Sequence, residues 1–274
     1  MLLRASRCLA EAREIETTVK VLLIPSSTGG PHAEACQYLT SFRINETVAI
    51  DAGSLGLYGG PEEQARIRHV FLSHSHIDHV ASLPIFLENV YTGQPPAVTV
   101  YGSAEVMESL ERNLFNGRLW PDLINQGPVD PPLFHRQLLE PGQSLTVEGL
   151  RITPVPVHHT VATHSFIVED ATAAVIFSSD TAATEEMWRR ANALPHLKAI
   201  FLEVTFPNAL ARLADLSMHL TPATFLQEVQ KLNRAVPIIV VHIKARFRGP
   251  VIQELQALGL SQLEIGESGR VYTF

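Results

Sequence analysis

Five short apolar runs rich in β-branched residues constrain the fold of this chain more than any other feature. Each run stops shortly before a polar residue of a type that can bind metal or take part in catalysis: 48–50 before Asp51, 70–72 before His74, 174–177 before Asp180, 199–202 before Glu203 and 238–241 before His242. Continuous apolar runs of this length are typical of strands that are buried on both faces. Open α/β sheets place their sites at the carboxyl ends of such strands. The pattern therefore predicts strands that bring these polar residues to a common edge.

The composition fits a compact enzyme. The chain has 274 residues, of which 46% are hydrophobic and 18% charged, so it is long enough to bury a substantial core. We find no low-complexity tract or domain boundary and expect one domain over residues 1–274, with residues 1–18 as an N-terminal extension. The net charge of −7, without a basic patch, argues against a nucleic-acid polymer as the partner.

Cysteine usage and hydropathy predict a cytoplasmic protein. Cys8 and Cys36 cannot form a disulfide framework, and charge interrupts the first apolar residues too early for a secretory signal. No run approaches the roughly 18 apolar residues of a membrane span, so we expect no membrane partner. A homodimer is one option for its assembly.

A histidine-rich motif follows the second apolar run. His74 and His76 alternate in an extended segment and so face the same way, and Asp78 and His79 follow at the start of a helix. Three imidazoles and a carboxylate suit borderline metals of the zinc kind, with room for two ions. The alternative is a solvated turn, but the rest of the chain supplies further candidate ligands.

Helices are expected between the strands. Ser103 and Thr221 are placed to cap two of them, another follows Thr184, and a fourth spans 250–258. The segment 94–154 is rich in proline and turn residues, and we expect it to be an excursion over the site.

The His-x-His-x-Asp-His motif resembles that of the metallo-β-lactamase superfamily, and the similarity covers most of the chain. It implies an α/β (α+β) fold, a four-layer αββα sandwich with a two-metal site where the sheets meet. It also implies two divalent metal ions, zinc first, with manganese or iron as alternatives. The implied metal ligands are His74, His76, Asp78, His79, His159, Asp180 and His242.

Within this set, Asp180 resembles the carboxylate that bridges both metals, with a helix cap as the alternative. His159 is preferred to His158 because its spacing to 165–166 resembles the family pattern. His242 resembles the last ligand, with a core histidine as the alternative. Asp51 is interpreted as a partner that orients a ligand.

Two stretches resemble the phosphodiesterase branch of this superfamily. Glu203 and His219 resemble its Glu–His pair, in which the histidine protonates the leaving alkoxide and the glutamate orients it. With Asp78 they are the implied catalytic residues. Lys244 and Arg246 follow the last ligand and could neutralise a phosphate oxygen; solvated charges are the alternative.

The chain resembles most closely the class II cyclic-nucleotide phosphodiesterases. The stretches 28–31 with 49–53, 113–122, and 203–208 with 219–222 carry this similarity, although Val204 stands where a small residue is usual. It implies an enzyme that hydrolyses cyclic AMP or cyclic GMP to the 5′-monophosphate by attack of a metal-bridging hydroxide. A small cyclic nucleotide is then the partner, and Asn116, in the middle stretch, a substrate-binding residue.

Two other activities remain open. A tRNA 3′-end processing endonuclease usually carries a basic arm between the third histidine and the bridging aspartate, but here that interval is 180 − 159 = 21 residues. A thioester or lactone hydrolase is the third option. His158, His164 and His32 have no assigned role.

Overall fold

The computed structural model describes residues 18–27, 36–122, 124–125 and 132–274. In this part of the chain the strands form two seven-stranded mixed sheets. The first sheet has the order β14 (Val271–Thr273), β1 (Lys20–Leu23), β2 (Phe42–Ile44), β3 (Val48–Ile50), β4 (His69–Phe71), β5 (Val98–Gly102) and β6 (Phe134–Leu138). The second has the order β13 (Leu263–Ile265), β12 (Ile238–Val241), β11 (Leu197–Glu203), β10 (Ala174–Phe177), β9 (Thr163–Glu169), β8 (Leu150–Val157) and β7 (Leu145–Val147).

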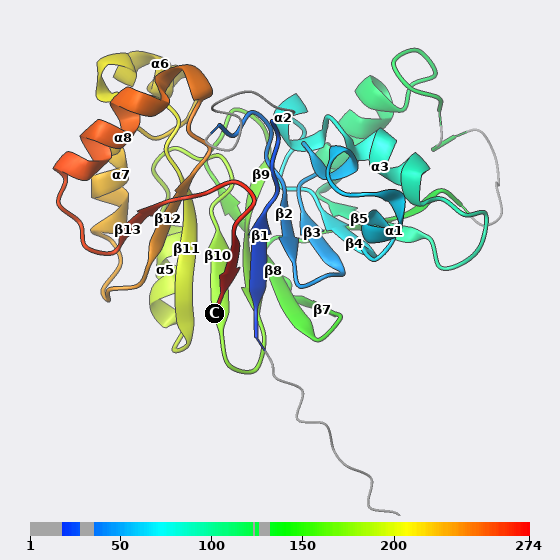
Figure 1. Cartoon of the computed structure of the whole chain (residues 1–274), viewed down its shortest axis with the longest axis horizontal. Helices are drawn as coiled ribbons and strands as arrows, with labels where there is room; N and C mark the ends of the chain where they lie inside the picture. Colours follow the sequence, from blue (N-terminus) through cyan, green and yellow to red (C-terminus); the bar gives the residue numbers. More distant parts are fainter. Residues whose placement is uncertain (1–17, 28–35, 123, 126–131) are drawn as a thin grey trace, which may run out of the picture.

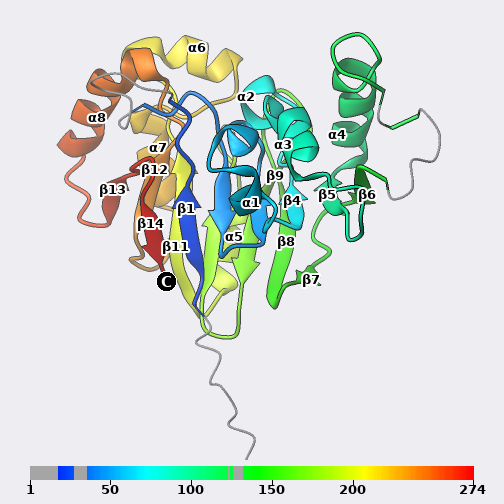
Figure 2. The same cartoon turned by 45° about the vertical axis from the view of Figure 1, so that its right-hand side comes forward.

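Helices cover the outer faces of both sheets (Figures 1 and 2). On the side of the first sheet lie α1 (Pro61–Gln64), α2 (Ile77–Val80), α3 (Leu83–Val90) and α4 (Ala104–Ser109). On the side of the second lie α5 (Glu186–Ala193), α6 (Ala211–Leu216), α7 (Pro222–Val229) and α8 (Arg248–Ala257). This arrangement is the αββα sandwich that the sequence predicted.

Three apolar layers hold the sandwich together. Phe71, Phe166 and Phe201 belong to the cluster between the two sheets. Phe86 belongs to the cluster under the helices of the first sheet, and Trp188 to the one under the helices of the second. Each sheet is therefore buried on both faces, which explains why its strands read as unbroken apolar runs.

The predicted strands are confirmed, and their pairing brings the polar residues together. Strands β3, β4, β5 and β6 are parallel to one another, as are β10, β11, β12 and β13. Parallel neighbours end at the same edge of a sheet. The loops after these strands therefore meet at one end of the sandwich, the end where α2 and α6 lie at the top of Figure 1.

The predicted helices are also present, with one shifted boundary. The Ser103 side chain accepts a hydrogen bond from the Val106 N–H, and Thr221 forms a reciprocal capping box with Thr224. The helix predicted to begin at Pro250 begins at Arg248 instead. Proline is tolerated there because an N–H in the first turn has no acceptor within the helix.

The prediction for residues 94–154 is wrong. In place of an excursion, this segment contains β5, α4, β6, β7 and most of β8, and it carries the chain from one sheet to the other. Pro154 and Pro156 are compatible with β8 because β7 pairs only with residues 150–152. Proline has no backbone N–H to donate, and no donor is needed where the neighbouring strand does not pair.

Among the described residues, no helix combines the length and apolar character needed to cross a bilayer.

Candidate metal centre

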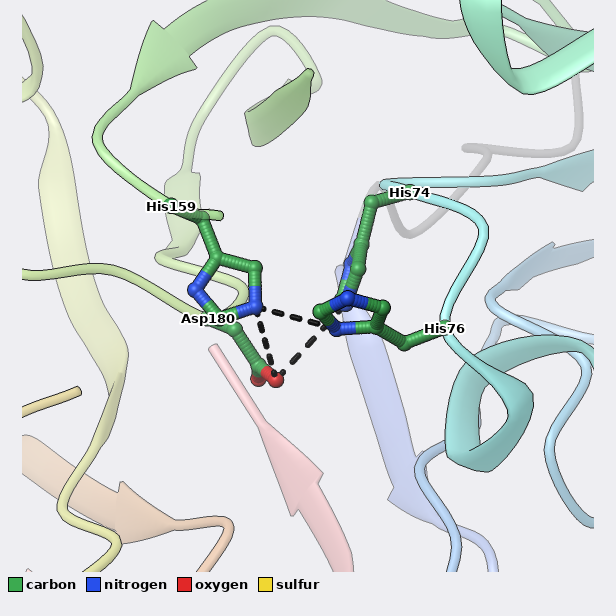
Figure 3. A group of neighbouring side chains, drawn as sticks. All are labelled: His74, His76, His159 and Asp180. Carbon is green, nitrogen blue, oxygen red and sulfur yellow. Dashed lines mark hydrogen bonds and ion pairs between the residues drawn. The ribbon is translucent and has the colours of Figure 1, made fainter. Parts of the chain in front are cut away.

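Four side chains converge where the two sheets meet at their carboxyl ends. His74 and His76 come from the loop after β4, His159 from the loop after β8, and Asp180 from the loop after β10 (Figure 3). Their candidate ligand atoms all lie within 4.8 Å of one another. Nδ1 of His76 is 3.1 Å from Nε2 of His159, and Nε2 of His74 is 3.7 Å from Oδ2 of Asp180. The structure thus brings together the residues predicted to hold one metal.

A second group adjoins the first and shares Asp180 with it. Its members are Asp78, His79, Asp180 and His242. Oδ2 of Asp180 lies 3.3 Å from Nε2 of His79 and 3.4 Å from Nε2 of His242. Nε2 of His242 is also 3.3 Å from Oδ2 of Asp78. The seven predicted ligands therefore form two adjoining groups around one carboxylate.

Close backbone packing fixes the position of Asp78. The Thr40 N–H donates to the carbonyl of Asp78 at 2.8 Å, and the Ala52 N–H donates to the carbonyl of His79 at 2.7 Å. A Cβ at Gly53 would overlap the Asp78 carbonyl oxygen and lie 2.8 Å from backbone atoms of Thr40. Only glycine fits this close approach, so residues 51–53 hold the first turn of α2 in place.

Backbone strain is concentrated at this end of the sandwich. Asp51, Ser179 and His242 have φ values of 59°, 57° and 61°, in the left-handed region that side chains other than glycine rarely adopt. Such residues persist only where the surrounding structure holds them, and they cluster at functional sites. The strained positions are at or directly beside Asp51, Asp180 and His242, which follow the ends of β3, β10 and β12.

Asp51 orients His79 directly and His74 through Ser73. Oδ2 of Asp51 accepts hydrogen bonds from Nδ1 of His79 at 2.7 Å and from the Ser73 hydroxyl at 2.8 Å. Because the hydroxyl proton points at Asp51, the Ser73 oxygen accepts from Nδ1 of His74 at 2.9 Å. Both imidazoles then carry their proton on Nδ1 and present a bare Nε2. Neither Nε2 atom has a hydrogen-bond partner in the part of the chain that the structure describes.

His159 and His242 are oriented in the same sense, whereas His76 faces the site through Nδ1, which lies 3.1 Å from Nε2 of His159. Nδ1 of His159 donates to the carbonyl of Met218 at 3.1 Å, and Nδ1 of His242 contacts the Thr205 hydroxyl at 2.9 Å. When these rings are neutral, the unprotonated nitrogens of His74, His79, His159 and His242 face the carboxylates of Asp78 and Asp180, and these acceptor atoms repel one another. A divalent cation removes this repulsion, and the donor set is one that such cations bind. The residues present fit a divalent metal site.

The groups of the cluster shift one another's pKa values in different directions. Burial lowers the pKa of His74 and His159. Burial opposes ionisation of Asp78 as well, but its hydrogen bond to His242 and the neighbouring positive groups hold its pKa well below the usual range. Burial also disfavours protonation of His79, yet Asp180 and Asp51 outweigh it and raise the pKa of His79. A metal ion and protons compete for the same atoms here.

A carboxylate–imidazole pair lies beside the two groups. Nδ1 of His219 donates to Oε1 of the buried Glu203 at 2.7 Å, and the ring centres of His219 and His159 are 4.9 Å apart. Burial disfavours the protonated ring, but the Glu203 carboxylate outweighs this effect and raises the pKa of His219. The arrangement can hold a protonated imidazole next to the proposed metals.

The predicted substrate-binding residues have different surroundings. Nζ of Lys244 is 2.9 Å from Oδ2 of Asp78, so this residue is part of the site. Arg246 is exposed, two residues further along. The structure does not bring Asn116 to the cluster: its side chain accepts from the N–H groups of Arg118 and Leu119 and donates to the Arg112 carbonyl.

The sequence assigned no role to two residues of the site, Ser73 and Thr205. Ser73 directly precedes His74, and Thr205 stands two residues after Glu203, which was the available signal. Of the unassigned histidines, His158 contacts the Ala183 carbonyl through Nδ1 at 2.7 Å, and His164 is buried in β9. His32 lies outside the described residues.

Comparison with known families and curated proteins gives a consistent result. The family model for the beta-lactamase superfamily domain matches residues 54–243. A probable 3′,5′-cyclic-nucleotide phosphodiesterase from Yersinia pestis is 28% identical over 226 residues, covering 73% of this chain and 63% of that protein. The 3′,5′-cyclic-nucleotide phosphodiesterase 1 of Saccharomyces cerevisiae is 24% identical over 213 residues, covering 65% and 57%. The chain thus spans about six-tenths of the length of these curated relatives.

Solved structures share the fold. Unliganded yeast PDE1 superposes with a TM-score of 0.74 at 18% identity, covering 93% of this chain and 99% of that one. The short form of human tRNase Z superposes with a TM-score of 0.63 at 14% identity, covering 92% and 98%. At these identities the similarity concerns the fold alone.

Proposed function

The chain belongs to the metallo-β-lactamase superfamily, and we propose that it is a single-domain, metal-dependent phosphodiesterase that hydrolyses 3′,5′-cyclic nucleotides to 5′-monophosphates. The observation that carries this proposal is the Glu203–His219 pair, whose 2.7 Å hydrogen bond lies beside two groups of metal-ligand type. The names of the curated relatives support the same chemistry.

We propose that two divalent ions bind, one at His74, His76 and His159 and the other at Asp78, His79 and His242, with Asp180 shared. Imidazole and carboxylate ligands favour zinc, with manganese or iron as alternatives. When bound, such a pair of ions lowers the pKa of water and offsets the charge of a phosphodiester. The bare, inward-facing nitrogens of His74 and His79 support this assignment.

His219 is the proposed general acid. Glu203 holds its Nδ1 proton, which leaves Nε2 to deliver a proton to the departing 3′ oxygen. The raised pKa keeps the ring protonated at higher pH than an ordinary histidine. An alkoxide is a poor leaving group, so its departure depends on such a donor.

Charge at the mouth of the site is proposed to bind the phosphate. Lys244, already in contact with Asp78, and the exposed Arg246 can each neutralise a non-bridging phosphate oxygen. For Asn116 the substrate-binding role stays a prediction, because its amide is engaged within its own turn.

The structure of one interval argues against the tRNA-processing alternative. Strands β9 and β10 lie between His159 and Asp180, and they pair antiparallel with each other. This interval therefore has no room for a basic arm that would hold a polynucleotide. Thioester hydrolysis is disfavoured for a different reason. A thiolate leaves without the help of a proton donor, so the Glu203–His219 pair would have no task in that reaction.

Three substrates assayed in parallel separate these activities. Purified protein, loaded with zinc or manganese, is incubated with cyclic AMP, a tRNA precursor and a thioester. We expect turnover of cyclic AMP only. Cleavage of the tRNA precursor or thioester with no loss of cyclic AMP would contradict the proposal.

Replacement of His219 tests the mechanism. His219→Ala should lower turnover of cyclic AMP by about 10²–10⁴-fold, because the leaving oxygen loses its proton donor. Metal content, measured by elemental analysis, should be unchanged. His135→Ala, which removes an exposed histidine from β6, is the matched control and should retain full turnover. An unchanged rate in His219→Ala would remove this residue from the mechanism.

A further inference from the structure

The Thr205 hydroxyl connects the two functional parts of the site. Its Oγ1 atom lies 2.7 Å from Oε2 of Glu203, 2.9 Å from Nδ1 of His242 and 3.2 Å from Nδ1 of His219. Thr205 itself is fully buried. One hydroxyl group thus contacts the last candidate ligand and both members of the proton-donor pair.

Counting protons fixes the direction of these hydrogen bonds. The Glu203 carboxylate is surrounded by donors: Oε1 accepts from the Thr181 N–H and from His219, and Oε2 lies 3.2 Å from the Leu220 N–H. The single Thr205 proton therefore goes to Oε2, its shortest contact, in preference to the His242 carbonyl at 3.3 Å.

With its proton committed to Glu203, the Thr205 oxygen can only accept from His242. A neutral His242 must then carry its one proton on Nδ1, which leaves Nε2 free for a cation. That Nε2 atom faces Oδ2 of Asp78 at 3.3 Å and Oδ2 of Asp180 at 3.4 Å. The hydroxyl thus selects the tautomer of His242 that a cation requires.

Ser73, which follows β4 of the first sheet, forms an equivalent set of hydrogen bonds. Ser73 donates to Asp51 and accepts from Nδ1 of His74, as Thr205 donates to Glu203 and accepts from Nδ1 of His242. A carboxylate, a hydroxyl and an imidazole are joined in the same order in both places. Only in the Thr205 case does the carboxylate also hold the imidazole proposed as general acid.

Building on the proposed function, we propose that Thr205 is a positioning residue that links metal binding at His242 to the orientation of His219. Its hydroxyl sets the His242 tautomer on one side. On the other side it helps to hold the Glu203 carboxylate in the position from which Oε1 orients His219. Loss of the hydroxyl therefore weakens metal binding and proton donation together.

Metal affinity is the first readout, and it does not depend on any activity. Zinc affinity is measured by competition with a chromophoric chelator for wild type, Thr205→Val and Thr205→Ser. Valine has nearly the shape of threonine but no hydroxyl, so Thr205→Val should lose about 10- to 100-fold in affinity for its weaker ion. Thr205→Ser should restore it. Thr153→Val, which removes a buried hydroxyl that forms a hydrogen bond with Ser144, is the matched control.

Two substrates with different leaving groups provide the second readout, at saturating metal. The leaving group of cyclic AMP is an alkoxide that needs a proton. The leaving group of bis(p-nitrophenyl) phosphate is a stable phenolate that does not. Thr205→Val should lose roughly 10-fold or more in turnover of cyclic AMP and little with the nitrophenyl ester. Equal losses on both substrates, or Thr205→Ser as impaired as Thr205→Val, would overturn the proposal.

The outcomes distinguish this inference from the proposed function. If wild type does not hydrolyse cyclic AMP, the proposed function fails, while the zinc affinities still decide the role of Thr205. If Thr205→Val does not fold, Thr205→Ala takes its place. In addition, nitrogen NMR of metal-free wild type should show neutral His242 protonated on Nδ1, and protonation on Nε2 would refute the assignment.

Discussion

Asp180 contributes one oxygen atom to both ligand groups. Its Oδ2 lies within 3.9 Å of nitrogens from His74, His79, His159 and His242. These histidines come from both sheets. Burial opposes ionisation of Asp180, but the neighbouring His242, His79 and His74 outweigh it and hold the pKa of Asp180 well below its usual range. A shared carboxylate at this point is what the proposed pair of ions requires.

His164 tests how burial without a partner affects stability. Burial lowers the pKa of His164, the attraction of Glu105 opposes this weakly, and Nδ1 has no hydrogen-bond partner among the described residues. In the unfolded chain the ring titrates near a pKa of about 6.5. As pH falls below that value the unfolded state binds the proton first, so the free energy of unfolding decreases.

We therefore expect His164→Phe to remove part of this pH dependence. Urea denaturation at pH 7 and pH 5.5, with metal present in excess, should show a smaller loss of stability in the variant than in wild type. Parallel losses in the two proteins would show that His164 is protonated equally in both states.

The sequence made the ligands of the site predictable but not the residues that orient them. His74, His76, Asp78 and His79 stand in one short motif, and Asp180 and His242 follow apolar runs, so local pattern located them. The hydroxyl groups of Ser73 and Thr205 act partly through residues that are distant in the chain: Asp51 is 22 residues from Ser73, and His242 is 37 residues from Thr205. Periodicity carries no information on such contacts. Asn116 is the opposite case: a local motif predicted a role in substrate binding, but its side chain forms hydrogen bonds within its own turn.

At the scale of elements, the short helix α2 and the turn after β3 form one unit. Ala52 and His79, and Thr40 and Asp78, are joined by backbone hydrogen bonds, with Gly53 packed between them. This contact places the first turn of α2, and with it two candidate ligands. The sequence predicted that the histidine motif begins a helix, which is confirmed, but not what holds that helix in place.

Gly53→Ala should therefore destabilise the protein and weaken metal binding together. The added methyl group overlaps backbone rather than a flexible side chain, so the turn or α2 must move, at a cost of about 1–3 kcal/mol. Chemical denaturation and zinc titration measure the two effects. Gly249→Ala in α8, where a Cβ meets nothing within 4 Å, is the control and should be neutral or stabilising. A variant at Gly53 as stable as wild type would show that the approach is not tight.

The segment 94–154 shows where a prediction from amino-acid composition fails. Its prolines and turn residues suggested irregular structure, but they lie between short strands or on an open strand edge. Proline frequency along the chain does not reveal which strand edges a sheet leaves uncovered. The central strands were predictable because burial on both faces leaves a continuous apolar signal.

At the scale of the whole molecule, the site joins the two halves of the sandwich. His74, His76, Asp78 and His79 follow a strand of the first sheet, whereas His159, Asp180 and His242 follow strands of the second. A metal bound here connects the sheets at one end, in addition to the apolar layer between them. A metal that binds the folded state and not the unfolded state also stabilises the folded state by mass action.

Removal of metal should consequently lower the melting temperature. Ligand at 100 times its dissociation constant contributes about 2.7 kcal/mol, which corresponds to a fall of about 5–10 °C for a chain of this size. Differential scanning calorimetry with and without a chelator measures the change. An Asp180→Asn variant should show a smaller change. Equal melting temperatures of the wild-type protein in both conditions would argue against a resident metal.

The central claim, that this centre serves hydrolysis of cyclic nucleotides, is tested most directly by the product formed from cyclic AMP. Phosphorus NMR of a reaction with the metal-loaded protein should show conversion to 5′-AMP, because the proposed general acid, His219, would protonate the 3′ oxygen. The chelated protein should show no conversion. Release of 3′-AMP, or cyclic AMP that stays intact with both ligand groups filled by metal, would contradict the account.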